Sequence, residues 1–158
     1  MNKSDKKFMA EAVKLSFKGM RTNQGGPFGA VIVKNGKIIG RGVNRVTSTN
    51  DPTAHAEIVA IRDACQNLKT FRLDGCFIYT SSEPCPMCFG AIHWARINKI
   101  FFACTRLDAA SIEFDDNYIY KEIVKSIDQR DIETEQLLRD EAIKAFELWR
   151  KKYDKIKY

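Results

Sequence analysis

Three side chains that bind metals lie at two separated places in the sequence. His55 stands in "PTAHAEIVA", while Cys85 and Cys88 stand three residues apart in "EPCPMC". Two thiolates and one imidazole are a ligand set that suits zinc. Three protein ligands leave one position of a tetrahedral site for water, as in catalytic rather than structural zinc sites. The sequence therefore predicts one catalytic Zn²⁺ per subunit, held by His55, Cys85 and Cys88.

A carboxylate accompanies the expected metal ligands. Glu57 follows His55 by two residues. On a regular helix this spacing turns the two side chains apart, so Glu57 is poorly placed to bind the metal itself. It can still reach a water or a substrate beside the metal, where a carboxylate acts as a proton shuttle. Glu57 is therefore the expected catalytic acid and base.

Each fragment of this pattern has a simpler interpretation. A Cys-x-x-Cys pair alone also occurs in redox sites, and a single histidine is more often structural, which is how we interpret His93. A closed, non-enzymatic zinc module is a further alternative, but no fourth ligand lies near the motif. The joint arrangement of His-x-Glu followed by Pro-Cys-x-x-Cys is the signature of zinc-dependent nucleobase deaminases. It favours a catalytic zinc over a structural or redox site.

The elements expected around these motifs alternate between strands and helices. Asn35-Gly36 between two apolar runs predicts a β-hairpin. Buried strands are expected in "GCFIYTS" and "KIFFACT". Helices are expected over residues 5–20, 53–68 and 86–96 and from about residue 140. This alternation predicts an α/β fold, a three-layer α-β-α sandwich around a mixed sheet.

The helix starts carry specific expectations because the metal ligands lie there. Asp51 or Thr53 is expected to cap the helix that carries Glu57, with Pro52 in its first turn. Pro86 is expected to open the helix that carries Cys88.

Length and composition suit one compact domain that spans residues 1–158. Hydrophobic residues make up 44% of the 158, which is enough for a core. No apolar run is long enough to cross a bilayer, and the first residues lack the pattern of a secretory signal. We therefore expect a cytoplasmic protein without a membrane partner, in which the five cysteines are free or bound to metal.

The net charge of +6 is concentrated at the two ends of the chain. Residues 1–7 contribute +2 and residues 150–158 contribute +4, so residues 8–149 are neutral overall. A duplex or tRNA binder is expected to carry a broad basic face instead. Nucleic acid is therefore not the expected partner.

Several segments resemble the small bacterial guanine deaminases of the cytidine deaminase-like superfamily. The similarity is carried by "GGPFGAVIV", "NDPTAHAEI", "EPCPMCFGAIHWAR", "FDDNYIYKE" and the terminal tyrosine. Cytosine, tRNA-adenosine and riboflavin-pathway deaminases share the zinc motif, so "LDAASIEFDD" and the tail are what favour guanine. One position departs from the pattern: Glu113 stands where a small residue, usually glycine, is expected before Phe114.

The resemblance implies zinc-dependent hydrolysis of guanine to xanthine and ammonia, with attack of a zinc-activated water at C2. Glu57 would carry the water proton to a ring nitrogen, and Asp116 would act as a second acid that helps the amine leave. The implied substrate-binding residues are Phe28, Asn44, Ala56, Phe114 and Tyr158. The alternative substrates are guanosine, another small aminated base, or adenosine in tRNA.

The residues by themselves allow ordinary structural roles for most of this implied set. Phe28 and Phe114 would also suit a core, Asn44 would suit a turn, and Asp116 with its neighbour Asp115 would suit a solvated pair. The resemblance also implies a homodimer in which residues 140–158, a helix and tail, are exchanged between subunits. Tyr158 would then close the partner's active site.

Overall fold

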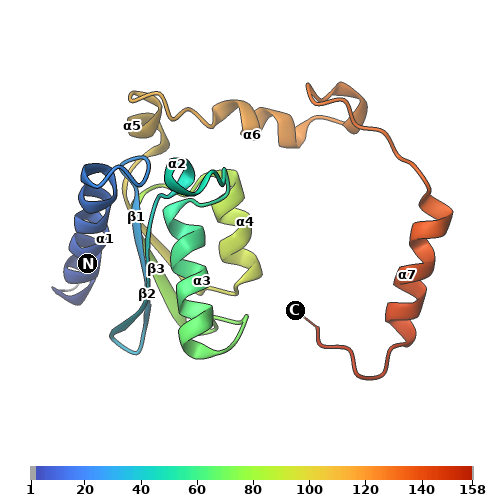
Figure 1. The fold of residues 1–158 in the computed structure, drawn as a ribbon, viewed down its shortest axis with the longest axis horizontal. Coiled ribbons are helices and arrows are strands. Elements are labelled where there is room, and N and C mark those ends of the chain that lie inside the picture. The colour runs from blue at the N-terminus through green and yellow to red at the C-terminus, as the bar shows by residue number, and fades with distance from the viewer. Residues whose placement is uncertain (1–2, 158) are drawn as a thin grey trace. The chain divides into compact units, whose positions relative to one another are not determined.

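The computed structural model describes residues 3–157, and these fall into two units that divide after Asp116. We call residues 3–116 the sheet unit and residues 117–157 the C-terminal unit (Figure 1). The sheet unit contains α1 (Lys3–Arg21), β1 (Gly29–Lys34), β2 (Lys37–Val43), α2 (Val46–Thr49), α3 (Ala56–Leu68), β3 (Cys76–Ser82), α4 (Pro86–Trp94), β4 (Lys99–Cys104) and α5 (Arg106–Ala110). The C-terminal unit contains α6 (Asn117–Val124), the 3₁₀ turn η1 (Ile127–Gln129) and α7 (Arg139–Lys151).

The strands form a mixed sheet, as the sequence predicts, and their order is β2-β1-β3-β4. β1 runs antiparallel to β2 and to β3, whereas β3 and β4 are parallel and are joined through α4. The β1–β2 hairpin turns at Asn35 and Gly36, whose φ angles of 49° and 73° lie in the left-handed region that these residue types tolerate. The predicted hairpin is therefore confirmed.

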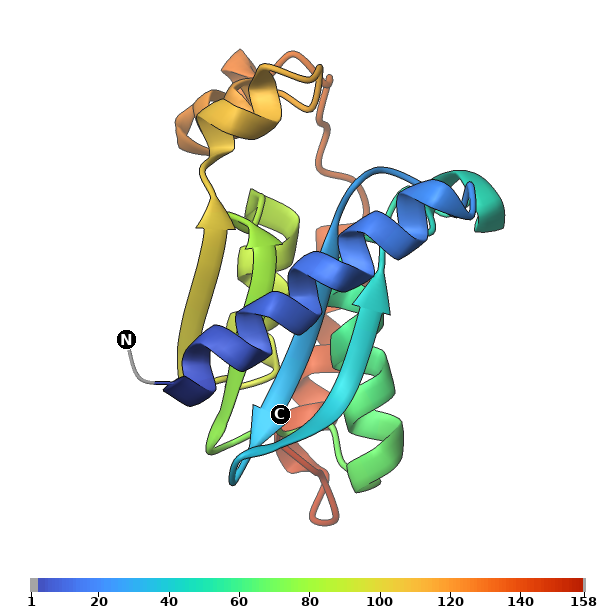
Figure 2. The ribbon, with the colours of Figure 1, turned by 90° about the vertical axis from the view of Figure 1, so that its left-hand side faces the viewer.

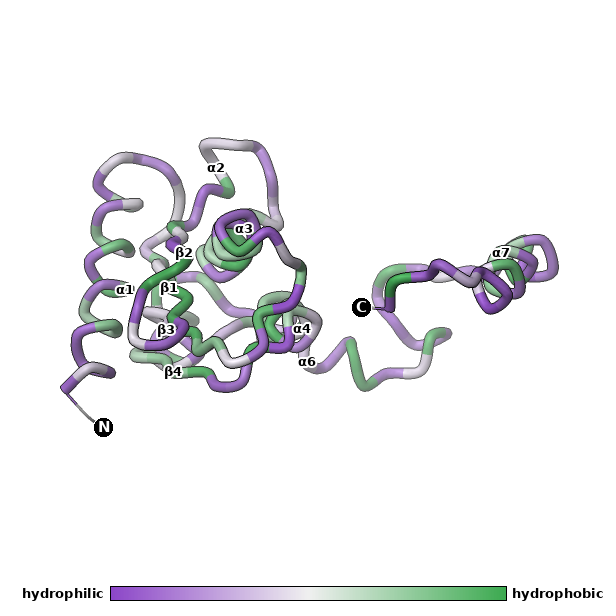
Figure 3. The backbone as a smooth tube through the Cα atoms, turned by 90° about the horizontal axis from the view of Figure 1, so that it is seen from below, coloured by the Kyte–Doolittle hydropathy of each residue, from purple (hydrophilic) through white to green (hydrophobic). Residues whose placement is uncertain are grey.

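Helices cover both faces of this sheet and make three layers. α1 lies across one face (Figure 2), and α3 and α4 lie on the other (Figure 3). Alternate residues of β1 and β3 divide between two cores. The core under α1 contains Phe8, Ala12, Val31, Val33 and Tyr79. The core under α3 and α4 includes Ala30, Ile32, Ile78 and the α3 alanines at positions 56, 60 and 64. The predicted three-layer fold is thus confirmed.

Small residues bring the start of α3 close to the sheet. A Cβ added at Gly42 of β2 would lie 2.0 Å from the carbonyl oxygen of Ala56 and 2.6 Å from the backbone nitrogen of Ala60. Any larger residue at Gly42 would therefore force α3 away from β2. This close approach fixes the height of the helix start, and with it the position of His55, above the end of the sheet.

The predicted start of α3 near residue 53 is wrong, because the helix begins at Ala56. Asp51 does not cap it. Its Oδ1 instead accepts hydrogen bonds from the backbone N–H and the hydroxyl of Thr53, at 2.8 and 2.6 Å, and holds a separate turn. His55 takes the cap position with an extended backbone and no side-chain cap bond. Its imidazole is therefore available to the site.

The start of α4 is as predicted. Pro86 occupies the first turn, where its missing N–H removes no helical bond, and Cys85 takes the cap position. The helix ends at Trp94, two residues before the expected end.

The C-terminal unit contains the predicted helix near residue 140 but has no buried side chain among residues 117–157. Phe146, Leu148 and Trp149 of α7 are exposed at 69%, 70% and 45%. Large apolar side chains at this exposure favour a partner surface. No helix in the described residues has the length and apolar character needed to cross a membrane.

Candidate metal centre and active site

The three predicted metal ligands meet at the starts of α3 and α4. His55 caps α3, Cys85 caps α4, and Cys88 lies in the first turn of α4. Their ligand atoms all lie within 4.8 Å of one another. The free N–H groups and the positive dipole end at a helix start favour thiolates there. Both helices therefore aim an electropositive end at the place where the ligands converge.

The distances between these atoms fit a tetrahedral zinc ion. Each cysteine sulfur lies 3.6 Å from Nδ1 of His55. A tetrahedral ion with Zn–S of about 2.3 Å and Zn–N of about 2.0–2.1 Å separates sulfur from nitrogen by about 3.6 Å. His55, Cys85 and Cys88 are thus arranged to hold a metal ion, and the donor set suits Zn²⁺.

The electrostatics of the two cysteines agree with this interpretation. The pKa of Cys85 falls to about 4, chiefly because the Cys88 thiol donates a hydrogen bond to its sulfur, with a further contribution from His55. The same bond and burial raise the pKa of Cys88. The pair therefore holds one proton strongly, and a bound cation would displace it.

Glu57 lies beside the ligands without belonging to them. It stands in the first turn of α3 and is only 6% exposed. Its Oε2 is 3.4 Å from Sγ of Cys88, and its Oε1 accepts a hydrogen bond of 3.1 Å from the hydroxyl of Thr80. Burial raises the pKa of the Glu57 carboxyl. A buried carboxylate next to the metal position can accept and return a proton there.

Asn44 has the turn role that its residue type allows, and this fixes the orientation of its amide. Its Oδ1 accepts hydrogen bonds of 3.2 Å from the backbone N–H groups of Gly26 and Val46. Gly25 lies against the same oxygen, because a Cβ there would come within 2.2 Å of it. With the oxygen occupied, the NH₂ group remains as the donor that Asn44 can offer to a ligand.

Two aromatic rings lie on the loops near this asparagine, and a carboxylate follows the second ring by two residues. Phe28 and Phe114 form an edge-to-face pair with ring centroids 4.9 Å apart, and Phe114 remains 46% exposed. Burial, followed by the negative charge of Cys85, raises the pKa of Asp116. Asp115 is exposed, whereas Asp116 is half-buried. The two neighbours therefore differ in environment, although the sequence alone allowed a solvated pair.

The loop keeps a left-handed turn without the expected glycine. Glu113 has a φ of 71°, a conformation that favours glycine. Backbone N–H groups of Glu113 and Phe114 close the turn by bonding to the carbonyls of Ala110 and Ala109, both at 3.1 Å.

The sequence matches the cytidine and deoxycytidylate deaminase zinc-binding region over residues 2–104, which include the three metal ligands and Glu57. The chain belongs to this deaminase family. The zinc-binding character of the family and the fit of the ligand atoms together confirm the predicted Zn²⁺ site.

Relatives within the deaminase family differ in how much of the chain they match. A guanine deaminase of Bacillus subtilis (strain 168) is 51% identical over 151 residues, which cover 96% of this chain and 97% of that protein. An X-ray structure of guanine deaminase from Bacillus subtilis has a TM-score of 0.95 at 50% identity and covers 100% of this chain and 99% of the other. A tRNA-specific adenosine deaminase of Aquifex aeolicus (strain VF5) is 49% identical over 77 residues, 49% of this chain and 51% of that protein.

The structure does not place two of the expected substrate-binding residues, Ala56 and Tyr158, against a substrate. Ala56 begins α3 and is fully buried in the core, and its predicted contact with the substrate stays a prediction. Tyr158 lies outside the described residues. Its predicted contact with the substrate stays a prediction.

Sequence reasoning missed Thr80, which donates the hydrogen bond to Glu57. The signal was a polar residue that follows two apolar ones in a row: Cys76, Ile78 and Thr80 alternate along β3, so they share one face. Such a residue on a buried face is expected to have a hydrogen-bond partner. The partner lies 23 positions away in the sequence, and spacing alone does not identify it.

Proposed function

We propose that this chain hydrolyses guanine to xanthine and ammonia with one Zn²⁺ bound by His55, Cys85 and Cys88. The observation that carries the proposal is the buried Glu57 carboxylate 3.4 Å from a metal-ligand sulfur, on a chain similar over nearly its full length to a guanine deaminase. The similarity to the tRNA-specific adenosine deaminase of Aquifex aeolicus, in contrast, covers only about half of this chain.

The metal and Glu57 divide the proton chemistry between them. A bound zinc ion would supply an activated water and would stabilise the negative charge on the attacking oxygen. Glu57 accepts the proton of that water and returns it to a ring nitrogen of the base. Its buried position suits both steps, because a raised pKa brings a carboxyl closer to the pH at which it works as acid and as base.

Residues on the loops bind and orient the purine. Phe28 stacks on the base, with Phe114 packed edge-on against it. Asn44 donates from its NH₂ group to a ring or carbonyl acceptor, because its oxygen is already bonded to the backbone. Asp116, whose pKa is raised, delivers a proton to the departing amine.

A substrate panel tests this function. Ammonia release is measured with zinc-loaded protein on guanine, guanosine and cytosine, and inosine formation is measured on a tRNA anticodon stem-loop at low and high salt. We expect guanine to be the best substrate. Equal or faster turnover of guanosine or cytosine would contradict the choice of base. Salt-sensitive inosine formation would instead favour tRNA as the substrate.

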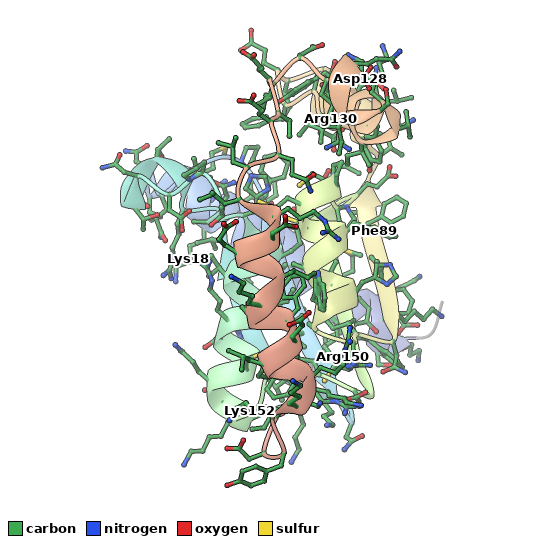
Figure 4. The ribbon with its side chains drawn as sticks, turned by 90° about the vertical axis from the view of Figure 1, so that its right-hand side faces the viewer. Lys18, Phe89, Asp128, Arg130, Arg150 and Lys152 are labelled. Atoms are coloured by element: carbon green, nitrogen blue, oxygen red, sulfur yellow. The ribbon has the colours of Figure 1, made fainter. Side chains whose placement is uncertain are left out.

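We also propose that the chain forms a two-fold dimer by exchanging its C-terminal segment, residues 140–158, so that Tyr158 closes the partner's active site. The apolar side chains of α7 support this, since the C-terminal unit buries none of them by itself. The sheet unit has exposed apolar residues on α4 and β4 that would suit such a segment: Phe89, Trp94 and Phe102. Arg150 and Lys152 lie at the C-terminal end of α7 (Figure 4), where basic side chains suit the helix dipole.

Complementation between two inactive variants tests the exchange. One variant carries Glu57→Gln with an intact tail, and the other lacks residues 154–158 but retains Glu57. Each alone should have low activity at an unchanged zinc content. Co-expressed mixed dimers should recover guanine turnover, because one site would combine an intact Glu57 with the partner's tail. Full activity of the truncated protein, or a monomer mass in solution, would contradict the exchange.

The compartment that we propose is the cytoplasm. The cysteines among the described residues form no disulfide, and cysteines outside disulfides favour a reducing environment.

A further inference from the structure

Thr80 is the first polar side chain in its row on β3, and it follows the apolar part of that row. It belongs to the row of β3 side chains that faces α3 and α4, after Cys76 and Ile78. All three are essentially inaccessible, and Thr80 is only 1% exposed. A buried hydroxyl without a partner would be destabilising, so its partner identifies why it is there.

The partner of Thr80 is the carboxylate of Glu57. The Thr80 hydroxyl donates to Oε1 at 3.1 Å, and this bond is buried. The other oxygen, Oε2, lies 3.4 Å from Sγ of Cys88. The two oxygens are therefore not equivalent: one is bonded to the sheet, and the other lies against a metal ligand.

The backbone around Thr80 holds the donor in a fixed position. Thr80 is paired with Ala30 of β1 on one side and with Phe102 of β4 on the other. A residue with a strand on each side has little freedom to move, and a threonine has few side-chain rotamers. Glu57, in contrast, has three rotatable side-chain bonds, which burial alone does not restrict to one orientation.

We propose that Thr80 is a positioning residue for Glu57: it holds Oε1 so that Oε2 is the oxygen that moves protons at the metal. The inference depends on the proposed function, because it assigns this task within the deamination reaction. The hydrogen-bond partner of the Thr80 hydroxyl is Glu57, which is none of the three metal ligands. Its effect is on the geometry of the acid and base, which must be set before the proton moves.

Three variants separate positioning from ordinary stability. Thr80→Val keeps the shape and removes the donor, and Thr80→Ser restores a hydroxyl. Ser81→Ala is the matched control, because the Ser81 oxygen accepts a buried hydrogen bond of 3.0 Å from the backbone N–H of Gly29 and does not bond to Glu57. All three are measured as zinc-loaded protein for zinc content, thermal unfolding, and kcat and KM on guanine.

We expect Thr80→Val to lower kcat by about tenfold to a hundredfold, the range for loss of a hydrogen bond to a charged group, with KM changed by less than about threefold. Zinc content should stay at one per chain. Thr80→Ser should recover kcat to within about threefold of the wild type, and Ser81→Ala should keep kcat even if its melting temperature falls. A loss of kcat in Ser81→Ala equal to that in Thr80→Val would overturn the proposal.

Crystal structures of the zinc-loaded wild type and Thr80→Val proteins give a reading that does not depend on turnover. The Glu57 carboxylate should rotate or lose its single orientation in the variant. An unchanged Glu57 side chain would overturn the positioning role, whatever the kinetics. If the wild type does not deaminate guanine but the Glu57 carboxylate is reoriented in Thr80→Val, the proposed function fails and the positioning role stands. If the wild type is active and Thr80→Val matches it, only the positioning role fails.

Discussion

The two halves of the candidate site are built in different ways. The metal half, formed by His55, Glu57, Cys85 and Cys88, stands on the starts of α3 and α4 above the end of the sheet. The substrate half stands on connections: Phe28 and Asn44 lie just outside the β1–β2 hairpin, and Phe114 and Asp116 lie on the turn after α5. Regular elements thus hold the groups that we propose perform the chemistry, and loops hold the groups that we propose select the base.

The similarity to other proteins follows this division only in part. The match to the deaminase family ends at residue 104 and so contains the whole metal half together with Phe28 and Asn44 of the substrate half. It does not contain Phe114 or Asp116. The guanine deaminase of Bacillus subtilis, in contrast, is similar over 96% of this chain. Changes in the metal half should therefore remove any deamination, whereas changes in the substrate half should alter rate or choice of base.

The largest effect is expected from Cys88→Ala. Cys88 is fully buried, and its loss leaves two ligands that bind zinc weakly. The variant should lose zinc and activity, together with the stability that bound metal gives, about 3–4 kcal/mol at a hundred to a thousand times the dissociation constant. Metal analysis and thermal unfolding measure both. A chelator should lower the melting temperature of the wild type but not of the variant. One zinc per chain in the variant would show that the ligands are misassigned.

The next largest effect is expected from Glu57→Gln, which keeps shape and removes the base. Turnover of guanine should fall by about a hundredfold to ten-thousandfold, because a general acid and base contributes on this scale. Zinc content should stay at one per chain, which separates this variant from Cys88→Ala. Steady-state kinetics on zinc-loaded protein give the result. Activity equal to that of the wild type would exclude Glu57 from the mechanism.

A change in the substrate half should have a smaller effect. Asp116→Asn should lower kcat on the order of tenfold to a hundredfold and leave KM for guanine nearly unchanged, if the carboxyl delivers a proton in the transition state. Asp115→Asn is the matched control, because its side chain is exposed. A change confined to KM would make Asp116 a binding residue. Equal kcat and KM in the two variants would indicate that Asp115 and Asp116 are the solvated pair that the sequence allowed.

The sequence predicted the metal half better than the substrate half, for physical reasons. Asn35-Gly36 and Pro86 are strong local signals, since few conformations suit them, and both were placed correctly. The start of α3 was placed too early because the Asp51 side chain can either cap a helix or close a turn. In this chain it closes a turn with Thr53.

Contacts between residues far apart in the sequence could not be predicted from the spacing of motifs. The bond from Thr80 to Glu57 joins α3 to β3, and the pair of Phe28 and Phe114 joins the start of β1 to the loop after α5. Their residue types suited a core equally well, so only the resemblance to guanine deaminases singled out the aromatic pair. A tertiary structure was needed to place both.

The smallest expected effect tests the loop that carries Phe114 and Asp116. Glu113 has a φ of 71°, and a residue with a Cβ costs about 1–2 kcal/mol in that conformation relative to glycine. Glu113→Gly should relieve this strain, but glycine also gains freedom in the unfolded chain, so we expect a net gain of about 0.5 kcal/mol. Glu113→Ala is the control, because it removes the carboxylate and keeps the strain. A rise in melting temperature for glycine but not alanine would confirm strain as the cause. Equal shifts would assign the effect to the Glu113 side chain instead. Guanine turnover should stay within about twofold of the wild type in both variants, because the left-handed turn that positions Asp116 is already formed by glutamate.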